Sequence, residues 1–264
     1  LAMLITHPFS VDRRYSAWMI ILCAGFIAVH LVAMQIPQRP LRRGLRVVGW
    51  LLAAQILIEV AITRDRAAYL SGNPNVTASW MLPLLFTAPV TNAWTVVSAL
   101  ATVITGSRGA LLGVSVAFCA QKSLSLWVLA LGGALGAVVL ALARPSTAMN
   151  RLGTWTEAAQ FALERPIVGH GPGTYTELAV NEPYHPHADN LVLTIAAEQG
   201  IVGLAAWAYL AAAIAREALR SKAPGASGLL AVGVHNLVDC TVFWPWAGIF
   251  TMAVLALVVR DRDE

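Results

Sequence analysis

The sequence predicts an all-α fold, a polytopic bundle of transmembrane helices with about nine spans and one long extracytoplasmic loop that contains short helices. Hydrophobic residues make up 58% of the 264 residues and charged residues only 12%, whereas about a quarter of the residues in a soluble domain are charged. Apolar runs recur along the chain, and one long polar segment interrupts them at 144–190. We therefore expect a single membrane domain, 1–264, with the 144–190 loop inside it.

Each apolar run is interpreted as one membrane span. A helix needs about 20 residues to cross a bilayer, and several runs are shorter, so tilted or kinked spans are expected. Pro83, Pro89, Gly106 and Gly113 interrupt the stretch between residues 76 and 121, which therefore holds either two spans or three. The expected spans are 15–36, 45–62, 76–90, 91–105, 107–121, 124–143, 190–215, 227–242 and 244–259.

Arginine and lysine residues gather beside certain span ends and give the orientation, since short basic loops stay on the cytoplasmic side. In a bundle of about nine spans the 144–190 loop then faces the outside. The net charge of +4 comes from basic residues at span ends, which argues against a nucleic-acid partner. Three basic groups share the cytoplasmic side: Arg39, Arg42, Arg43 and Arg46; Arg216, Arg220 and Lys222; Arg260 and Arg262.

The 144–190 loop carries helix and turn signals. Thr154 and Glu157 have the spacing of a capping box, and apolar residues follow them at helical intervals. We expect a short amphipathic helix there, ended by Pro166. The glycines of the segment 169–173 predict turns after it. Without a preceding strand they are only a weak signal for a nucleotide-binding loop.

Ionisable residues within apolar runs are functional candidates, because an unpaired charge in hydrocarbon is unfavourable. Asn190, Thr194 and Glu198 follow one another at intervals of four residues and form a polar stripe on one helix face. His235 and Asp239 are expected to share a face of the next span. Each stripe serves either hydrogen bonding between helices or a direct chemical role.

His185 and His187 stand directly before an apolar run. An imidazole titrates near neutral pH and can act as a general base toward a hydroxyl. A metal site with neighbouring carboxylates and a solvated loop histidine are the alternatives. No ligand pair with helical spacing supports a preformed metal site, and Cys23, Cys119 and Cys240 form neither a CxxC motif nor a disulfide framework.

Arg108 lies at the outer mouth of an apolar run, and Arg151 opens the 144–190 loop. A buried arginine needs an anion, and two guanidinium groups suit a diphosphate, which accepts charge-assisted hydrogen bonds. The alternative for each side chain is an extension toward lipid phosphates at the membrane surface.

Several motifs follow one another in a specific order: GNPN at 72–75, TGSRG at 105–109, R-x3-W-x2-A from Arg151 to Ala158, P-x2-G-x-G-x-G from Pro166 to Gly173, H-x-x-N with L-x6-E-x-G-x2-GL from His187 to Leu204, and H-N-x-x-D from His235 to Asp239. Together they resemble the O-antigen ligase and O-antigen polymerase superfamily of bacterial membrane glycosyltransferases. The resemblance extends over most of the chain. Because members of that superfamily usually have more spans before the loop, we expect that N-terminal spans are missing here.

The resemblance implies a metal-independent, inverting transfer of a glycan from an undecaprenyl diphosphate carrier to an acceptor hydroxyl, with no cofactor. The reaction would take place on the outer face of the bacterial inner (cytoplasmic) membrane, with 144–190 as the catalytic loop and the lipid bilayer as surroundings. A lipid A core as acceptor makes the enzyme a ligase of lipopolysaccharide biosynthesis. Another glycan chain makes it a polysaccharide polymerase, and a protein hydroxyl makes it a protein O-glycosyltransferase.

The resemblance also assigns site residues, with one departure from the family pattern. Counted back from Glu198, the usual His-Asn pair falls on Asp189 and Asn190, two residues after His187. The catalytic base is therefore either His187 or Asp189. The other candidates form a diphosphate-binding pair and a supporting polar network: Arg108 and Arg151, and Asn190, Glu198, His235 and Asp239.

A secondary transporter is the rival from another functional class. Glu198, His235 and Asp239 would then form a proton or substrate path. Transporters hold their site near the middle of the membrane, whereas the polar residues here are expected near one face, beneath the long loop. That arrangement favours the enzyme.

Overall fold

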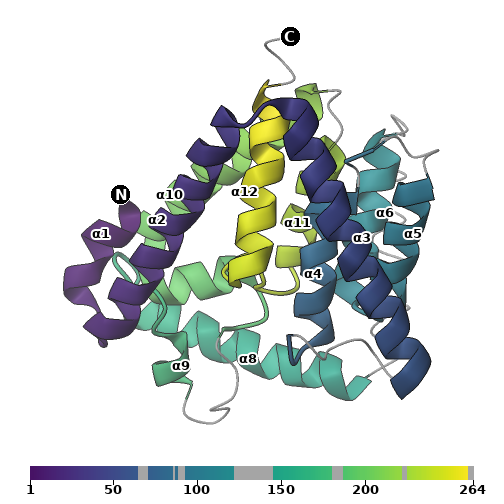
Figure 1. Ribbon diagram of the computed structural model, residues 1–264. Helices are drawn as coiled ribbons and strands as arrows, with labels where there is room; N and C mark the ends of the chain where they lie inside the picture. The colour runs from purple at the N-terminus through teal and green to yellow at the C-terminus, as the bar shows by residue number, and fades with distance from the viewer. Residues whose placement is uncertain are drawn as a thin grey trace. The chain divides into compact units, whose positions relative to one another are not determined.

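The computed structural model describes residues 1–64, 71–85, 87–88, 93–121, 145–179, 187–221 and 225–260. Every regular element among these residues is a helix, which confirms the all-α fold class. In chain order (Figure 1) the elements are α1 Ala2–Thr6, the 3-10 helix η1 His7–Phe9, α2 Arg13–Gln35, α3 Gln38–Thr63, α4 Pro74–Leu85, α5 Ala93–Ile104, α6 Arg108–Gln121, α8 Pro145–Glu164, α9 Tyr175–Leu178, α10 Leu191–Arg220, α11 Ala226–Asn236 and α12 Pro245–Arg260.

Among the described residues, three helices are long and apolar enough to cross a membrane: α2, α3 and α10. They coincide with the expected spans 15–36, 45–62 and 190–215. Helices α5, α6 and α12 are apolar but shorter, and the expected span 124–143 lies outside the described residues. The apolar helices indicate a membrane protein. The total of about nine spans and the outward orientation of the loop stay predictions.

The chain divides into two compact units. The first contains Leu1–Gly25, Ala141–Ala213 and Asn236–Cys240, and the second contains Phe26–Leu140, Ile214–His235 and Thr241–Glu264. Each unit is therefore assembled from segments that lie far apart in the sequence. The single membrane domain expected from the sequence stays a prediction.

The second unit is organised around α4, which contacts α3, α5, α6 and α12. Figure 1 shows α12, in yellow, beside α4. Met81, Leu84, Trp94 and Leu257 are buried in one apolar cluster, and burial of such a side chain contributes about 1.5 to 3 kcal/mol. The indole N–H of Trp94 donates to the Thr87 hydroxyl at 3.1 Å, so this buried ring leaves no unsatisfied donor.

Helix α10 of the first unit is broken at Gly200, where φ is 58° and ψ is −155°. Only glycine adopts this backbone conformation readily. The break separates backbone groups that would otherwise pair inside the helix. The N–H groups of Ile201 and Val202 donate instead to the carbonyls of Pro166 and Ile167, at 2.8 and 3.2 Å.

The carbonyls freed by the same break also find partners in the segment after α8. The Ala197 carbonyl accepts the N–H of His170 at 3.0 Å, and the Glu198 carbonyl accepts the N–H of Gly171 at 2.7 Å. The backbone of segment 166–171 thus supplies the hydrogen bonds that the interrupted turn of α10 cannot form within the helix. This exchange keeps buried backbone groups paired, as an apolar environment requires.

Helix α8 differs from the short helix expected at Thr154. It begins at Pro145, and Thr154 lies in its middle. The Thr154 hydroxyl donates to the carbonyl of Arg151 at 3.0 Å, so Thr154 is not a helix cap and the capping-box interpretation is wrong. Proline is favoured in the first turn of a helix, where its missing N–H loses no bond, and this start overrides the later signal. The helix ends at Glu164, before Pro166 as expected.

Helix α11 ends at Asn236, earlier than the expected span end at residue 242. Asp239 therefore lies in the loop between α11 and α12, and the expectation that His235 and Asp239 share a helix face is wrong. The Asp239 carboxylate accepts the backbone N–H of Cys240 at 2.8 Å. Such local side-chain bonds compete with helical pairing and favour a loop at this point.

A substitution at Gly113 tests the contact between α6 and α11. A Cβ atom at Gly113 would stand 2.5 Å from the carbonyl oxygen of Ala231. We expect Gly113→Ala to lower the free energy of unfolding by about 1 to 3 kcal/mol, because the backbone of α11 has to move. Thermal unfolding in detergent measures the change.

Gly233→Ala is the matched control, because a Cβ atom there meets nothing within 4 Å. This variant should be neutral or more stable by up to about 1 kcal/mol, since alanine is the better helix former. Equal stability of the two variants would show that α6 and α11 are not packed as described.

Candidate functional site

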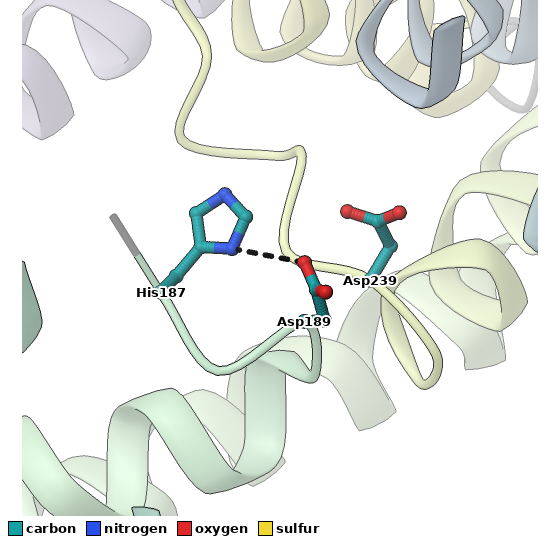
Figure 2. A group of neighbouring side chains, drawn as sticks. All are labelled: His187, Asp189 and Asp239. Carbon is teal, nitrogen blue, oxygen red and sulfur yellow. Dashed lines mark ion pairs between the residues drawn. The ribbon is translucent and has the colours of Figure 1, made fainter. Parts of the chain in front are cut away.

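His187, Asp189 and Asp239 lie together in the first unit. Figure 2 shows His187 and Asp189 on the segment that leads into α10, and Asp239 on the loop that follows α11. Nδ1 of His187 is 3.7 Å from Oδ1 of Asp189. Side-chain atoms of all three residues lie within 4.8 Å of one another. Two segments about fifty residues apart in the sequence thus meet at one cluster.

Arg151 joins this cluster from α8. Its Nη1 donates to the carbonyl of Val238 at 2.8 Å, and its Nη2 lies 3.4 Å from Oδ2 of Asp239. Its Nε is 3.8 Å from Oδ2 of Asp189. The guanidinium therefore faces both carboxylates and offsets the repulsion between them.

The same helix also holds the backbone beside His187. One turn after Arg151, the indole N–H of Trp155 donates to the carbonyl of Asp189 at 3.4 Å. The Thr154 hydroxyl lies 3.4 Å from the carbonyl of Ala188. The spacing of Arg151 and Trp155, four residues apart, puts both side chains on one face of α8. This face positions the segment that carries His187.

Local backbone structure turns the chain into α10 at this point. Asp189 has a φ of 51°, a left-handed conformation that a short polar side chain tolerates. Asn190 then caps the helix, because its Oδ1 accepts the N–H of Leu193 at 3.0 Å. Its Nδ2 donates to the carbonyl of Leu237 at 2.8 Å. Asn190 therefore both starts α10 and holds the loop that carries Asp239.

The position of Asp239 in the loop between α11 and α12 shifts the pKa of its carboxyl. Only 3% of the residue is exposed, and this burial raises the pKa of its carboxyl. The neighbouring Asp189 raises that pKa further, while His187 and Arg151 oppose the shift. The cluster thus combines an imidazole, two carboxylates and a guanidinium, which can accept a proton and stabilise a nearby charge.

The three residues His187, Asp189 and Asp239 have the composition of a cation site. Arg151, however, already contacts both carboxylates. A divalent cation between them would meet the positive guanidinium at short range, which is strongly unfavourable in a partly buried place. We therefore assign no metal to this cluster, and the metal-free site expected from the sequence stays a prediction.

Glu198 holds the glycine-rich segment in the first unit. The residue is 2% exposed, and its carboxylate accepts the backbone N–H groups of Gly173 at 2.8 Å and Tyr175 at 3.1 Å. The glycine-rich motif is therefore fixed to α10 by side chain as well as by backbone. Gly169 is needed there, since it has a φ of 65° and a Cβ atom would stand 2.3 Å from the carbonyl carbon of Glu198.

Tyr175 connects this fixed segment to α8. Its hydroxyl donates to the carbonyl of Thr154 at 3.2 Å, and the side chain is fully buried. Burial raises the pKa of the phenol above its ordinary value, and the nearby carboxylates of Glu157 and Asp189 add to this, so the hydroxyl keeps its proton as a donor. Thr154 in turn faces Ala188, the neighbour of His187.

The structure does not place every predicted site residue in one cluster. His187, Asp189, Asp239 and Arg151 are together, with Asn190 beside them. Arg108 begins α6 and His235 lies in the last turn of α11, so both belong to the second unit, and their part in the site stays a prediction. His185 lies outside the described residues.

Sequence reasoning gave no supporting role in the cluster to Thr154, which it assigned to a capping box, to Trp155, which it named only within the R-x3-W-x2-A motif, or to Tyr175. The four-residue spacing of Arg151 and Trp155 was a usable signal, because it predicts a shared helix face. No periodic signal pointed to Tyr175, whose partners lie 21 and 23 residues away in the sequence.

Glu198→Gln tests the attachment of the glycine-rich segment. A glutamine has only one carbonyl oxygen to accept the two N–H groups, and its own amide N–H₂ faces the second donor. We expect the free energy of unfolding to fall by about 1 to 3 kcal/mol, the penalty for an unsatisfied buried group. Thermal unfolding in detergent measures it.

Glu164→Gln is the control, because the Glu164 side chain is 61% exposed. Its effect should stay within about 0.5 kcal/mol. If both variants unfold at the same temperature as the parent protein, Glu198 does not fasten the segment.

Residues 93–208 match the family model described as O-antigen ligase. The matched range includes Arg108, Arg151, the segment with His187 and Asp189, and Glu198. This match confirms the resemblance to the O-antigen ligase superfamily and indicates a glycosyltransferase-like membrane enzyme. None of the curated proteins compared with the chain matches it.

Proposed function

We propose that this protein transfers a glycan from an undecaprenyl diphosphate carrier to an acceptor hydroxyl on the outer face of the inner membrane, as an O-antigen ligase does. The cluster of His187, Asp189, Asp239 and Arg151 carries the proposal, because it joins a proton acceptor to a cation in one place. Most of it lies within the range that matches the O-antigen ligase family.

His187 is the proposed base. With Nδ1 directed to Asp189 at 3.7 Å, the carboxylate orients the ring, and Nε2 takes the proton of the acceptor hydroxyl. The hydroxyl oxygen forms a bond to the anomeric carbon from the side opposite the diphosphate. The bond between that carbon and the phosphate oxygen breaks, and undecaprenyl diphosphate leaves. The configuration at the anomeric carbon is thereby inverted.

Arg108 and Arg151 are the proposed ligands of the diphosphate, whose negative charge grows as the bond breaks. The Arg151 side chain is 19% exposed, and its longest contact is the one to Asp189, at 3.8 Å. A diphosphate therefore competes with Asp189 for the guanidinium, while the bond to the Val238 carbonyl still anchors the side chain. When the donor binds, Asp189 gives up its contact with Arg151 and keeps its contact with His187, whose ring it orients.

The other predicted residues form the supporting network of this proposal. Asn190 and Asp239 hold the two segments of the cluster together through Leu237 and Arg151. Glu198 acts at a distance, through Tyr175 and Thr154. His235 is fully buried in α11, and its part in the network rests on the sequence.

Removal of the base gives the most direct test. We expect His187→Ala to lower the rate of glycan transfer by at least about a hundredfold, the usual contribution of a general base, while the protein still folds and binds donor. Transfer from a lipid-linked glycan to a lipid A core acceptor is measured with the reconstituted protein. His185→Ala should be milder.

Asp189→Asn, assayed beside His187→Ala, separates the two candidate bases. In the proposed mechanism the asparagine variant misorients His187 but leaves the proton acceptor in place, so it keeps more activity than the alanine variant. A dead Asp189→Asn variant and an active His187→Ala variant would identify Asp189 as the base.

Arginine variants test the diphosphate contact. We expect Arg108→Ala to raise the KM for the lipid-linked donor and to lower turnover, because the leaving group loses a cation. Arg151→Ala should have the same effects. Arg151→Lys should recover only part of the activity that Arg151→Ala loses, since lysine lacks the planar pair of donors. Steady-state kinetics with varied donor concentration measure both effects.

Arg165→Ala is the control, because Arg165 lies in the 144–190 segment with Arg151, is exposed and donates to the carbonyl of Phe9. It should leave the KM for the donor unchanged. Normal donor use by the Arg108 and Arg151 variants would show that these two residues only anchor the protein at the membrane surface.

A further inference from the structure

Four arginines gather near the beginning of α3, a helix that is long and apolar enough to cross a membrane. Arg39 and Arg43 are four residues apart, and so are Arg42 and Arg46. Like charges at this spacing repel each other on a helix surface. The first turn of α3 contains no acidic residue that would offset them. This part of the second unit therefore carries concentrated positive charge.

Two of the four arginines are held by polar groups of the second unit. Nη2 of Arg42 donates to the side-chain carbonyl of Gln38 at 3.3 Å. Nε and Nη2 of Arg46 both donate to the carbonyl of Thr87, at 3.2 and 2.8 Å. That carbonyl follows the end of α4, so Arg46 satisfies a backbone group and stays against the core.

Arg39 and Arg43 are different, because both are exposed. Within the described ranges of the chain, neither forms an ion pair with an acidic residue. An arginine pair of this kind presents several N–H donors to an anion outside the protein.

The two arginines border an open groove on α3, with a volume of about 680 Å³. Beyond them the lining is small and apolar, with Gly44, Val47 and Val48. A Cβ atom at Gly44 would meet nothing within 4 Å, so the glycine leaves this side of the helix open. Val47 is 54% exposed. The groove thus joins two cations to an apolar surface that continues along a candidate span.

We propose that this groove binds an anionic phospholipid. Its phosphate lies between Arg39 and Arg43, and one acyl chain runs along Gly44, Val47 and Val48. The charge of the arginines is complementary to the phosphate, which takes charge-assisted hydrogen bonds from guanidinium groups. The apolar lining is complementary to the acyl chain, and a free anion would leave it exposed to water. None of these residues takes part in the proposed glycan transfer.

Native mass spectrometry of the full chain in a neutral detergent tests the site. The protein is titrated with phosphatidylglycerol, and separately with phosphatidylcholine of the same acyl chains. We expect tighter binding of phosphatidylglycerol. The double variant Arg39→Gln with Arg43→Gln should bind it more weakly, by about fivefold for each arginine. A parent protein that binds both lipids equally overturns the proposal.

Gly44→Leu tests the acyl part of the groove while all four arginines remain. Leucine fills the open side of α3 and is a better helix former than glycine, so the variant should fold. We expect weaker binding of phosphatidylglycerol. Unchanged binding would show that no acyl chain occupies the groove. Excess inorganic phosphate should fail to displace the lipid, and displacement would identify the site as one for free anions.

Arg216→Gln with Arg220→Gln is the matched control. These two arginines are also exposed and four residues apart, near the end of α10. Their removal changes the net charge by the same amount but leaves the α3 groove intact, so binding should stay as in the parent protein. An equal loss in both double variants would show diffuse electrostatic attraction and overturn the proposal.

Discussion

Backbone groups inside an apolar helix need hydrogen-bond partners, and the break of α10 at Gly200 decides where those partners come from. The glycine-rich segment after α8 supplies them, with two carbonyls for Ile201 and Val202 and two N–H groups for the freed carbonyls. Glu198 extends the attachment to Gly173 and Tyr175. The segment resembles a phosphate-binding loop only in its glycine content. Gly169 serves close approach to α10, where a side chain would collide with the backbone of Glu198, whereas a Cβ atom at Gly171 would collide with Ser10.

The cluster around His187 depends on this attachment through α8. Tyr175, held by Glu198, donates to the Thr154 carbonyl, and the next residue, Trp155, donates to the Asp189 carbonyl. A continuous set of contacts therefore runs from the broken helix to the segment that bears the proposed base. Side chains with locked surroundings hold a reactive group more accurately than a flexible loop does. A buried glutamate far from the reacting atoms can thus influence the position of His187.

Hydrophobic patterning was sufficient to predict α2, α3 and α10, because long apolar runs leave few alternatives to a membrane helix. The positions of His187 and Arg151 beside apolar runs made them candidates, and the family resemblance added Asp189; the structure places the three together. The helix boundaries were less predictable, since the capping signal at Thr154 competes with the proline start at Pro145. The partners of Glu198 were not predictable at all. Periodicity shows which face of a helix is polar, but not which distant N–H groups that face will meet.

Arg151 links the electrostatics of the cluster to the proposed binding of the donor. Its guanidinium offsets the repulsion between Asp189 and Asp239, and the same donors are the ones a diphosphate would use. An anion that binds Arg151 must therefore weaken the attraction between its guanidinium and the carboxylates of Asp189 and Asp239. Asp239 is the more buried and keeps the shorter contact, at 3.4 Å against 3.8 Å for Asp189, so Asp189 is the carboxylate that loses its partner first. Because Asp189 also contacts His187, the proposed mechanism couples occupation of the donor site to orientation of the base through one side chain, and by linkage such coupling acts in both directions.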